Sequence, residues 1–340
     1  MTPATTQSAL LDDVQVTARR IFELISPELQ LVETEFERQA RSNIQVIAYI
    51  GEYLRRSGGK RVRPALTILS NYAVGGDGSN HSSIRMATVM EFLHTATLVH
   101  DDVIDKAETR RNRPSINSEF GNQTAVLMGD WLYMSAFETS LAERSLPILD
   151  ILTAVTRKMT EGELLQLTLL GRTDITEEQY FDVIARKTAY LFSACCEIGA
   201  LLGGANAETQ ARLRDYGMNL GTAFQLVDDL LDFTGDEETL GKPAGADLVE
   251  GKVSLPLIFL LQRCPELRAD IQTVIADQGY ANTPRQRILD ELGQTGALGM
   301  AKERAVEYAE AAVAALDGLN HSPHAQALTS IPVYIVERDR

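Results

Sequence analysis

The sequence predicts an all-α protein in which residues 1–340 form a single large helical domain. Glycine and proline residues interrupt the chain only briefly, and the stretches between them run to about 18 to 30 residues, a length typical of helices. No run alternates apolar and polar residues between turn signals, as a half-buried strand would. No low-complexity linker divides the chain, and we expect only about residues 1–12 to be frayed.

Individual segments justify this prediction in chain order. Within 84–104, apolar residues recur at helical spacing. Residues 125–137 and 221–233 are apolar on more than one face, which predicts that both helices lie in the middle of the bundle. Between them, Thr176 and Gln179 form a capping box that marks the start of another long helix.

The composition excludes several classes of protein. With 340 residues, 44% of them hydrophobic and 23% charged, the chain resembles a folded globular protein rather than a disordered one. A net charge of −15 argues against a nucleic-acid partner, because binding a phosphate backbone requires a basic surface. The three cysteines, two of them adjacent at Cys195 and Cys196, predict core residues in a reducing compartment rather than disulfides or a zinc site.

No segment has the pattern of a secretion signal or a membrane span. Residues 1–11 lack the basic residues with which a secretion signal begins, and Asp12 and Asp13 follow directly. The longest clean apolar run, 253–261, contains Pro256 and is much shorter than the about 20 residues that a span requires. We therefore expect a cytoplasmic protein with no integral membrane segment.

Two copies of the pattern DDxxD are the strongest chemical signal in the chain. They comprise Asp101, Asp102 and Asp105 in the first copy and Asp228, Asp229 and Asp232 in the second. In a helix the first and fifth residues of the pattern lie one turn apart on the same face, where two carboxylates repel each other. Both motifs sit inside apolar stretches, so a merely solvated acidic face explains them poorly. Carboxylates without nearby His or Cys suit Mg²⁺, which shares its ligand shell with water and substrate phosphates.

Basic residues accompany both motifs and a glycine turn. They are Lys60, Arg61 and Arg63 after the glycine pair 58–59, Arg110 and Arg111 after the first motif, and Lys242 and Lys252 after the second. The glycine turn lacks the spacing of a nucleotide P-loop, and no strand precedes it. Acids and cations placed together twice predict Mg²⁺ bridging a diphosphate, with Arg and Lys on its outer oxygens.

These residues resemble those of the trans-polyprenyl diphosphate synthases, the family of farnesyl, geranylgeranyl and longer-chain synthases. The resemblance extends from Gly58 to Arg340. The motifs that carry it are GGKRVRP (58–64), EFLHTATLVHDDVID (91–105), RRNRPSIN (110–117), GELLQL (162–167), KTA (187–189) and GTAFQLVDDLLDFTGDEETLGKPAGADLVEGKVSLPLI (221–258). It implies a helical bundle around a deep central cavity, and a homodimer.

The resemblance also implies the binding residues. The six motif aspartates would hold Mg²⁺, three ions per active site, on the diphosphate of an allylic substrate such as farnesyl or geranylgeranyl diphosphate. The residues implied to contact that diphosphate are Arg110, Lys187, Thr188, Gln225 and Lys242, with Lys252 nearby. Those implied to bind the second substrate, isopentenyl diphosphate, are Gly59, Lys60, Arg63, His94 and Arg111. His100 and Asp130 are expected to be structural, with Asp130 buried.

The implied reaction is ionisation followed by condensation and elimination. The metal ions and cations, with Lys187 and Lys242 among the catalytic residues, stabilise the departing diphosphate. The double bond of isopentenyl diphosphate attacks the allylic cation, and a proton is then lost. We expect the released diphosphate to accept it, because no side chain is an evident base.

The residues before the first acidic motif predict a long product. Ala96 and Thr97, one turn before Asp101, are expected to point down the cavity, and both are small where short-chain synthases tend to carry an aromatic residue. HTATLVHDDV (94–103) and YIVERDR (334–340) resemble octaprenyl and nonaprenyl (solanesyl) synthases, which make quinone side chains. We expect Tyr133 and Phe137 to form the cavity floor, and Ala96→Phe to shorten the product.

Four other functions compete with this one. A shorter-chain synthase, making geranylgeranyl or farnesyl diphosphate, shares the reaction and its motifs. A class I terpene cyclase has a mixed Asn/Ser/Glu second motif and no second diphosphate site, unlike the DDLLD and GGKR found here. A non-catalytic regulatory subunit loses one acidic motif, whereas this chain keeps both. An acidic helical scaffold would bind Mg²⁺ without turnover.

Overall fold

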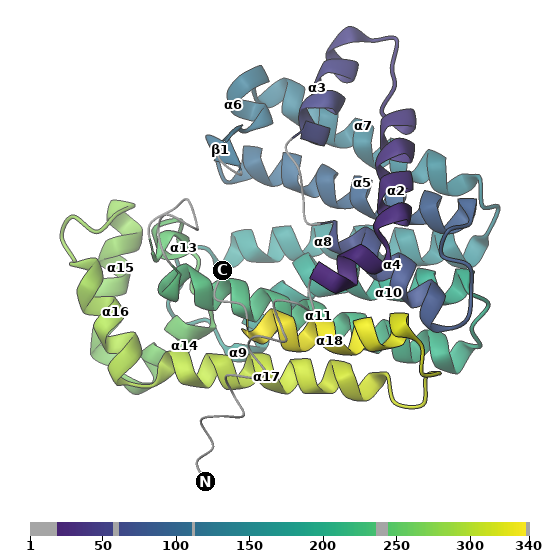
Figure 1. Cartoon of the computed structure of the whole chain (residues 1–340). Helices are drawn as coiled ribbons and strands as arrows, with labels where there is room; N and C mark the ends of the chain where they lie inside the picture. The colour runs from purple at the N-terminus through teal and green to yellow at the C-terminus, as the bar shows by residue number, and fades with distance from the viewer. Residues whose placement is uncertain (1–18, 57–60, 111–112, 236–243, 338–340) are drawn as a thin grey trace.

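The computed structural model describes residues 19–56, 61–110, 113–235 and 244–337 (Figure 1). In this part of the chain the only strands are β1 (Thr109–Arg110) and β2 (Arg113–Pro114), a short antiparallel pair with Arg110 opposite Arg113. All other regular structure in these residues is helical, so the predicted all-α class is confirmed.

Long helices make up the body of the protein. The α-helices are α2 (Ser26–Gln39), α3 (Gln45–Arg56), α4 (Val62–Ala73), α5 (His81–Ile104), α6 (Ile116–Phe120), α7 (Asn122–Leu141), α8 (Leu146–Leu169), α9 (Glu177–Ile184), α10 (Tyr190–Leu202), α11 (Ala207–Thr234), α13 (Ala246–Val249), α14 (Leu255–Arg263), α15 (Arg268–Asp277), α16 (Arg285–Gln294), α17 (Ala297–Ala315) and α18 (Pro323–Glu337). A π-helix, η1 (Ala185–Ala189), joins α9 to α10, and a 3₁₀ turn, η2 (Pro265–Leu267), precedes α15.

The helices form layers around a buried core. Helix α5 packs along α7, and α11 packs along both α10 and α17 (Figure 1). Helices α13, α15 and α16 gather at one end of the bundle. The capping box expected from Thr176 and Gln179 is formed at the start of α9. Among the described helices, none combines the length and apolar character needed to cross a bilayer.

Glycines allow the central helices to approach closely. A Cβ at Gly199 of α10 would lie 2.3 Å from the carbonyl oxygen of Thr67 on α4. A Cβ at Gly217 of α11 would lie 2.6 Å from the carbonyl oxygen of Phe192. The adjacent Cys195 and Cys196 are buried free thiols in this layer, as expected for core residues.

We expect Gly199→Ala to lower the free energy of unfolding by about 2 kcal/mol, because its methyl group would force α4 and α10 apart. Urea denaturation followed by circular dichroism measures this change. Gly293→Ala is the matched control, since nothing lies within 4 Å of a Cβ on that α16 residue. We expect the control to raise the free energy of unfolding by up to about 1 kcal/mol through helix propensity. Equal effects of the two substitutions would contradict the close approach.

Helix α7 differs from its prediction. Residues 221–233 of α11 are largely buried, as expected, but α7 exposes one side of its apolar surface. Leu127, Met134 and Leu141 are 68%, 62% and 46% exposed. The sequence pattern correctly indicated apolar residues on all sides of α7. Among the described helices, however, only α5 covers α7 along its length.

Candidate active site

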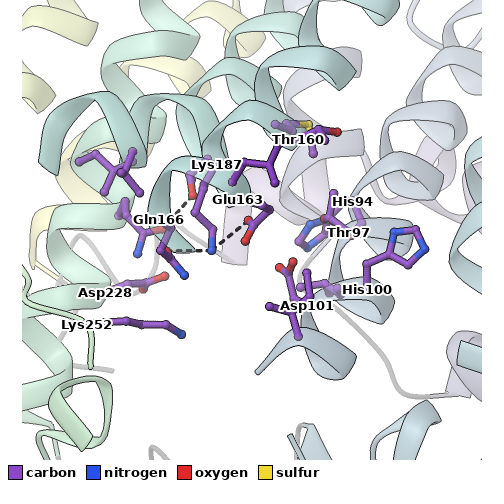
Figure 2. Close-up of a pocket in the computed structure, with 18 of the residues that line it drawn as sticks. His94, Thr97, His100, Asp101, Thr160, Glu163, Gln166, Lys187, Asp228 and Lys252 are labelled. Carbon is purple, nitrogen blue, oxygen red and sulfur yellow. Dashed lines mark hydrogen bonds and ion pairs between the residues drawn. The ribbon is translucent and has the colours of Figure 1, made fainter. Parts of the chain in front are cut away.

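The interior of the bundle contains a cavity of about 1480 Å³. Side chains from α4, α5, α7, α8, α9, η1, α10 and α11 line it, together with the segment 247–254. Typical small-molecule pockets have volumes of about 300–1,000 Å³, so this cavity can accommodate a larger ligand. Figure 2 shows residues of α5 on one side of it, with Asp228 and Lys252 on the other.

The first acidic motif lies at the C-terminal end of α5 and presents one of its three carboxylates to the cavity. Asp101 lines the cavity. Asp102 is buried and accepts a 2.7 Å hydrogen bond from Nε of Arg110, which itself lines the cavity. Asp105 caps the helix and pairs with Nζ of Lys252 at 3.2 Å. The three aspartates therefore have different surroundings despite their regular spacing.

The surroundings of the Asp101 carboxylate favour a bound cation. Burial and the neighbouring Glu163 carboxylate together raise the pKa of its carboxyl to about 7, against a lowering by Lys187. A carboxylate held in this way loses hydration without gaining an equivalent positive neighbour. A cation bound at this wall would stabilise the ionised form.

The second acidic motif lies on α11 and contributes two carboxylates to the cavity lining, Asp228 and Asp229. Asp229 is fixed by two donors, the hydroxyl of Tyr180 at 2.6 Å and the amide of Gln225 at 2.9 Å. Burial raises the pKa of Asp229 to about 7, with Asp247 as the next largest cause. Asp232 is 2% exposed, does not line the cavity, and accepts from the backbone N–H of Asp247.

A π-helical turn places Lys187 and Thr188 at the cavity. Their segment, η1, carries one extra residue in the turn between α9 and α10, a feature frequent at functional sites. The Lys187 ammonium lies 2.9 Å from both Glu163 and Gln166 of α8, as the dashed lines in Figure 2 show. Thr188 donates to Gln225 at 2.8 Å, so η1 is joined to α11 as well.

Residues predicted for the second diphosphate gather at the start of α4 and on α5. Arg63 and His94 both line the cavity, and the Arg63 guanidinium lies 4.9 Å from the centre of the Phe192 ring. Arg61, at the N-cap of α4, pairs with Glu33 and with Glu91, the latter at 2.6 Å. The other residues predicted for this diphosphate, Gly59, Lys60 and Arg111, lie outside the described residues, as does Lys242, which was predicted for the allylic diphosphate.

Several cavity residues were missed by the sequence-based assignment of roles. They are Glu91, Glu163, Gln166 and Tyr180, all of which line the cavity. The motif GELLQL contained a usable signal, because Glu163 and Gln166 are three apart and share a helix face. Tyr180 had no such signal, since its contact with Asp229 joins residues 49 apart in the chain.

We expect Tyr180→Phe to lower the free energy of unfolding by about 1–3 kcal/mol, because the buried Asp229 carboxylate would lose a donor. Chemical denaturation measures the loss. Tyr49→Phe, at a tyrosine of α3 that is 60% exposed, is the control and should change stability by less than about 0.5 kcal/mol. An unaltered stability of Tyr180→Phe would show that its hydroxyl does not support Asp229.

The chain-length residues are only partly placed as predicted. Thr97, Tyr133 and Phe137 line the cavity. Ala96 does not: it has no exposed surface and belongs to the hydrophobic core, so the prediction that it points into the cavity is wrong. Successive residues of a helix point about 100° apart, and here Ala96 points into the core while Thr97 lines the cavity.

His100 and Asp130 form a second difference. The Asp130 side chain is 63% exposed and lines the cavity, so its predicted burial is wrong. His100 stacks on Tyr133 at 5.8 Å and lies 3.1 Å from the carbonyl oxygen of Val126 and 3.4 Å from Asp130. These contacts join α5 to α7, and His100, which was expected to be structural, also lines the cavity.

The donor set is compatible with a divalent metal ion bound jointly with a substrate. In the described part of the chain, no group of three or more His, Cys, Asp or Glu side chains is arranged to hold a metal ion without other ligands. Asp101 and Asp228 offer carboxylate oxygens from opposite walls of the cavity. Mg²⁺ prefers such oxygens and commonly takes its other ligands from water and substrate phosphates.

Comparison with known proteins agrees with this site. Residues 44–292 match the family model described as polyprenyl synthetase. The chain belongs to the polyprenyl synthetase family. Octaprenyl diphosphate synthase of Escherichia coli K12 is 41% identical over 322 residues, which cover 94% of this chain and 99% of that one. The predicted enzyme class, a long-chain trans-prenyltransferase, is confirmed.

Solved structures of this family have the same fold. A polyprenyl synthase from Caulobacter crescentus CB15, complexed with calcium and isoprenyl diphosphate, superimposes with a TM-score of 0.89 at 35% identity, covering 95% of this chain and 98% of that one. A decaprenyl diphosphate synthase from Rhodobacter capsulatus gives a TM-score of 0.89 at 34% identity, covering 95% and 99%. The helical bundle around a cavity is therefore the fold of this family.

Proposed function

We propose that this enzyme makes octaprenyl or nonaprenyl diphosphate by adding isopentenyl diphosphate units to farnesyl or geranylgeranyl diphosphate. The observation that carries the proposal is the cavity itself. Acidic motifs from α5 and α11 stand at opposite walls of a cavity of about 1480 Å³, and many apolar side chains also line it. Such a site can bind a diphosphate at the acidic end and a long hydrocarbon beyond it.

Each wall has a proposed role in binding the allylic diphosphate. Asp101 and Asp228 would hold Mg²⁺. The other motif aspartates would help to bind a total of three ions. When bound, Mg²⁺ neutralises charge that develops on the departing diphosphate. Lys187 is held between Glu163 and Gln166, so its ammonium adds positive charge from a fixed position. Arg110, Thr188, Gln225, Lys242 and Lys252 are the remaining proposed contacts.

The second substrate would bind beside α4. Arg63 and His94 face the cavity there, and we assign the diphosphate of isopentenyl diphosphate to them together with Gly59, Lys60 and Arg111. Breaking the allylic C–O bond releases diphosphate, and the double bond of isopentenyl diphosphate then forms the new C–C bond. The proton lost from the resulting cation passes to the released diphosphate.

We also propose that the enzyme is a homodimer. The exposed apolar side of α7 supports this, because helices that are apolar all round are normally covered by other protein. Leu127, Met134 and Leu141 lie seven residues apart and so form one line along that side.

The test is incubation with farnesyl diphosphate, labelled isopentenyl diphosphate and Mg²⁺, with product length read by mass spectrometry after dephosphorylation. We expect products ending near eight or nine isoprene units, and none after chelation of the metal. A product that stops at three or four units would indicate a shorter-chain synthase. A folded protein that elongates nothing would indicate a regulatory subunit.

A further inference from the structure

The side chain of Arg61 joins three helices at the cavity. Its guanidinium donates from Nη1 to Glu91 of α5 at 2.6 Å. Nε and Nη2 donate to Glu33 of α2, the second of these at 3.1 Å. The side chains of Arg61 and Glu91 both line the cavity, yet they are only 13% and 7% exposed. All three nitrogens of the guanidinium therefore bind carboxylates in a largely buried network.

The backbone of Arg61 depends on these contacts. Its φ of 47° and ψ of 36° lie in the left-handed region, which residues other than glycine rarely adopt. The guanidinium also lies 5.9 Å from the centre of the Phe36 ring of α2, and Phe36 packs on Phe92 of α5 with ring centres 4.4 Å apart. Contacts with α2 and α5 thus hold the start of α4 in a conformation that its own backbone disfavours.

The residues beside this network are those assigned to isopentenyl diphosphate. Arg63 follows Arg61 by two residues, in the first turn of α4. His94 follows Glu91 by three residues, on the same face of α5. Both Arg63 and His94 line the cavity. The ion pair between Arg61 and Glu91 therefore fixes the two helices that carry these ligands relative to each other.

The charges of the network indicate that Arg61 acts through Glu91 rather than on the substrate. One guanidinium faces two carboxylates, so its positive charge is already balanced before a diphosphate binds. Without Arg61, the Glu91 carboxylate would remain at the cavity wall as an uncompensated negative charge. That charge would repel a diphosphate and compete for the cations that bind it.

We propose that Arg61 is a positioning residue for isopentenyl diphosphate. Its ion pair neutralises the Glu91 carboxylate and holds the first turn of α4, which carries Arg63. This inference rests on the proposed synthase function and adds to it a residue that acts without contacting the substrate. The allylic diphosphate is assigned to other walls of the cavity, on η1 and α11, so the effect is confined to one of the two substrates.

Initial rates of the first condensation, measured with each substrate varied in turn, test the proposal. For Arg61→Gln we expect the KM for isopentenyl diphosphate to rise about ten- to a hundredfold, as for the loss of a charge-assisted hydrogen bond. The KM for farnesyl diphosphate and kcat should stay within about threefold of the wild-type values. Adding Glu91→Gln to the same chain should bring the raised KM back toward the wild-type value, because the uncompensated carboxylate is then removed.

Two further variants separate this role from lost stability and from backbone strain. Arg85→Gln breaks an ion pair with Glu143 whose side chains are 14% and 8% exposed, but neither residue lines the cavity. It should lower the free energy of unfolding to a similar extent and leave both KM values unchanged. Arg61→Gly suits the left-handed backbone but lacks the guanidinium, so it should raise the KM for isopentenyl diphosphate as Arg61→Gln does.

Several outcomes would overturn the proposal. They are an unchanged KM for isopentenyl diphosphate in Arg61→Gln, a wild-type KM in Arg61→Gly, and an equal rise in Arg85→Gln. A raised KM that Glu91→Gln fails to lower would also overturn it, because Arg61 would then act on the substrate directly. A folded wild-type enzyme that elongates nothing would instead refute the proposed function.

Discussion

Replacing Asp101 or Asp228 with alanine is expected to lower kcat for chain elongation by about a hundred- to a thousandfold. Each carboxylate stands on one wall of the cavity, and each is assigned to the Mg²⁺ that stabilises the departing diphosphate. Losing one such electrostatic contribution removes about 3 to 4 kcal/mol of transition-state stabilisation. Initial rates at saturating substrates, measured across a range of Mg²⁺ concentrations, give both the rate and the metal requirement.

Asp130→Ala is the matched control for these two variants. Its carboxylate also lines the cavity, but it lies on α7 beside His100. We expect its kcat to stay within about threefold of the wild type, with no change in Mg²⁺ dependence. Equal losses in all three variants would mean that the total negative charge of the cavity matters rather than the positions of Asp101 and Asp228. Circular dichroism should show intact helices in every case.

Replacing Thr97 with phenylalanine is expected to shorten the product to about three to five isoprene units. Thr97 is one turn before Asp101 on the side of α5 that lines the cavity, so an aromatic ring there would block the growing chain below the acidic end. The rate of the first condensation should change little, because the diphosphate sites are untouched. Mass spectrometry of dephosphorylated products measures the length distribution.

Two further variants show whether the position of the ring is responsible. Thr97→Val keeps the size of the side chain and should leave product length unchanged. Ala96→Phe places the same ring in the packed core, where overpacking should cost about 1–3 kcal/mol of stability. A product shortened by Ala96→Phe but not by Thr97→Phe would restore the assignment based on sequence and contradict the orientation of α5 described above.

The sequence by itself determined the fold class and the chemistry. Both depend on local patterns: helical periodicity between brief turn signals, and acids and cations at short spacings. The repeated DDxxD and the segment KTA at 187–189 are recognisable because each lies within a few consecutive residues. The same patterns could identify which residues belong to the active site. They could not show which side chains surround each of these residues.

Only the tertiary structure decided which of these residues face the cavity. Asp101 faces the cavity. Asp102 instead accepts a hydrogen bond from Arg110, and Asp232 accepts one from the backbone N–H of Asp247. Sequence spacing places the first and fifth aspartates on one helix face, but it does not say what that face meets. Some of the contacts that settle this come from residues far apart in the chain, such as the hydrogen bond from Tyr180 to Asp229.

The rotation of α5 is the clearest example of a property fixed by packing. Both Ala96 and Thr97 are small, and sequence alone gave no reason to choose between them. Helix α7 approaches α5 so closely at Gly129 that a Cβ there would lie 2.2 Å from Nε2 of His100. This contact helps to fix α5 about its axis, with Ala96 in the core and Thr97 at the cavity. Periodicity defines the faces of a helix, and packing against its neighbours decides where each face points.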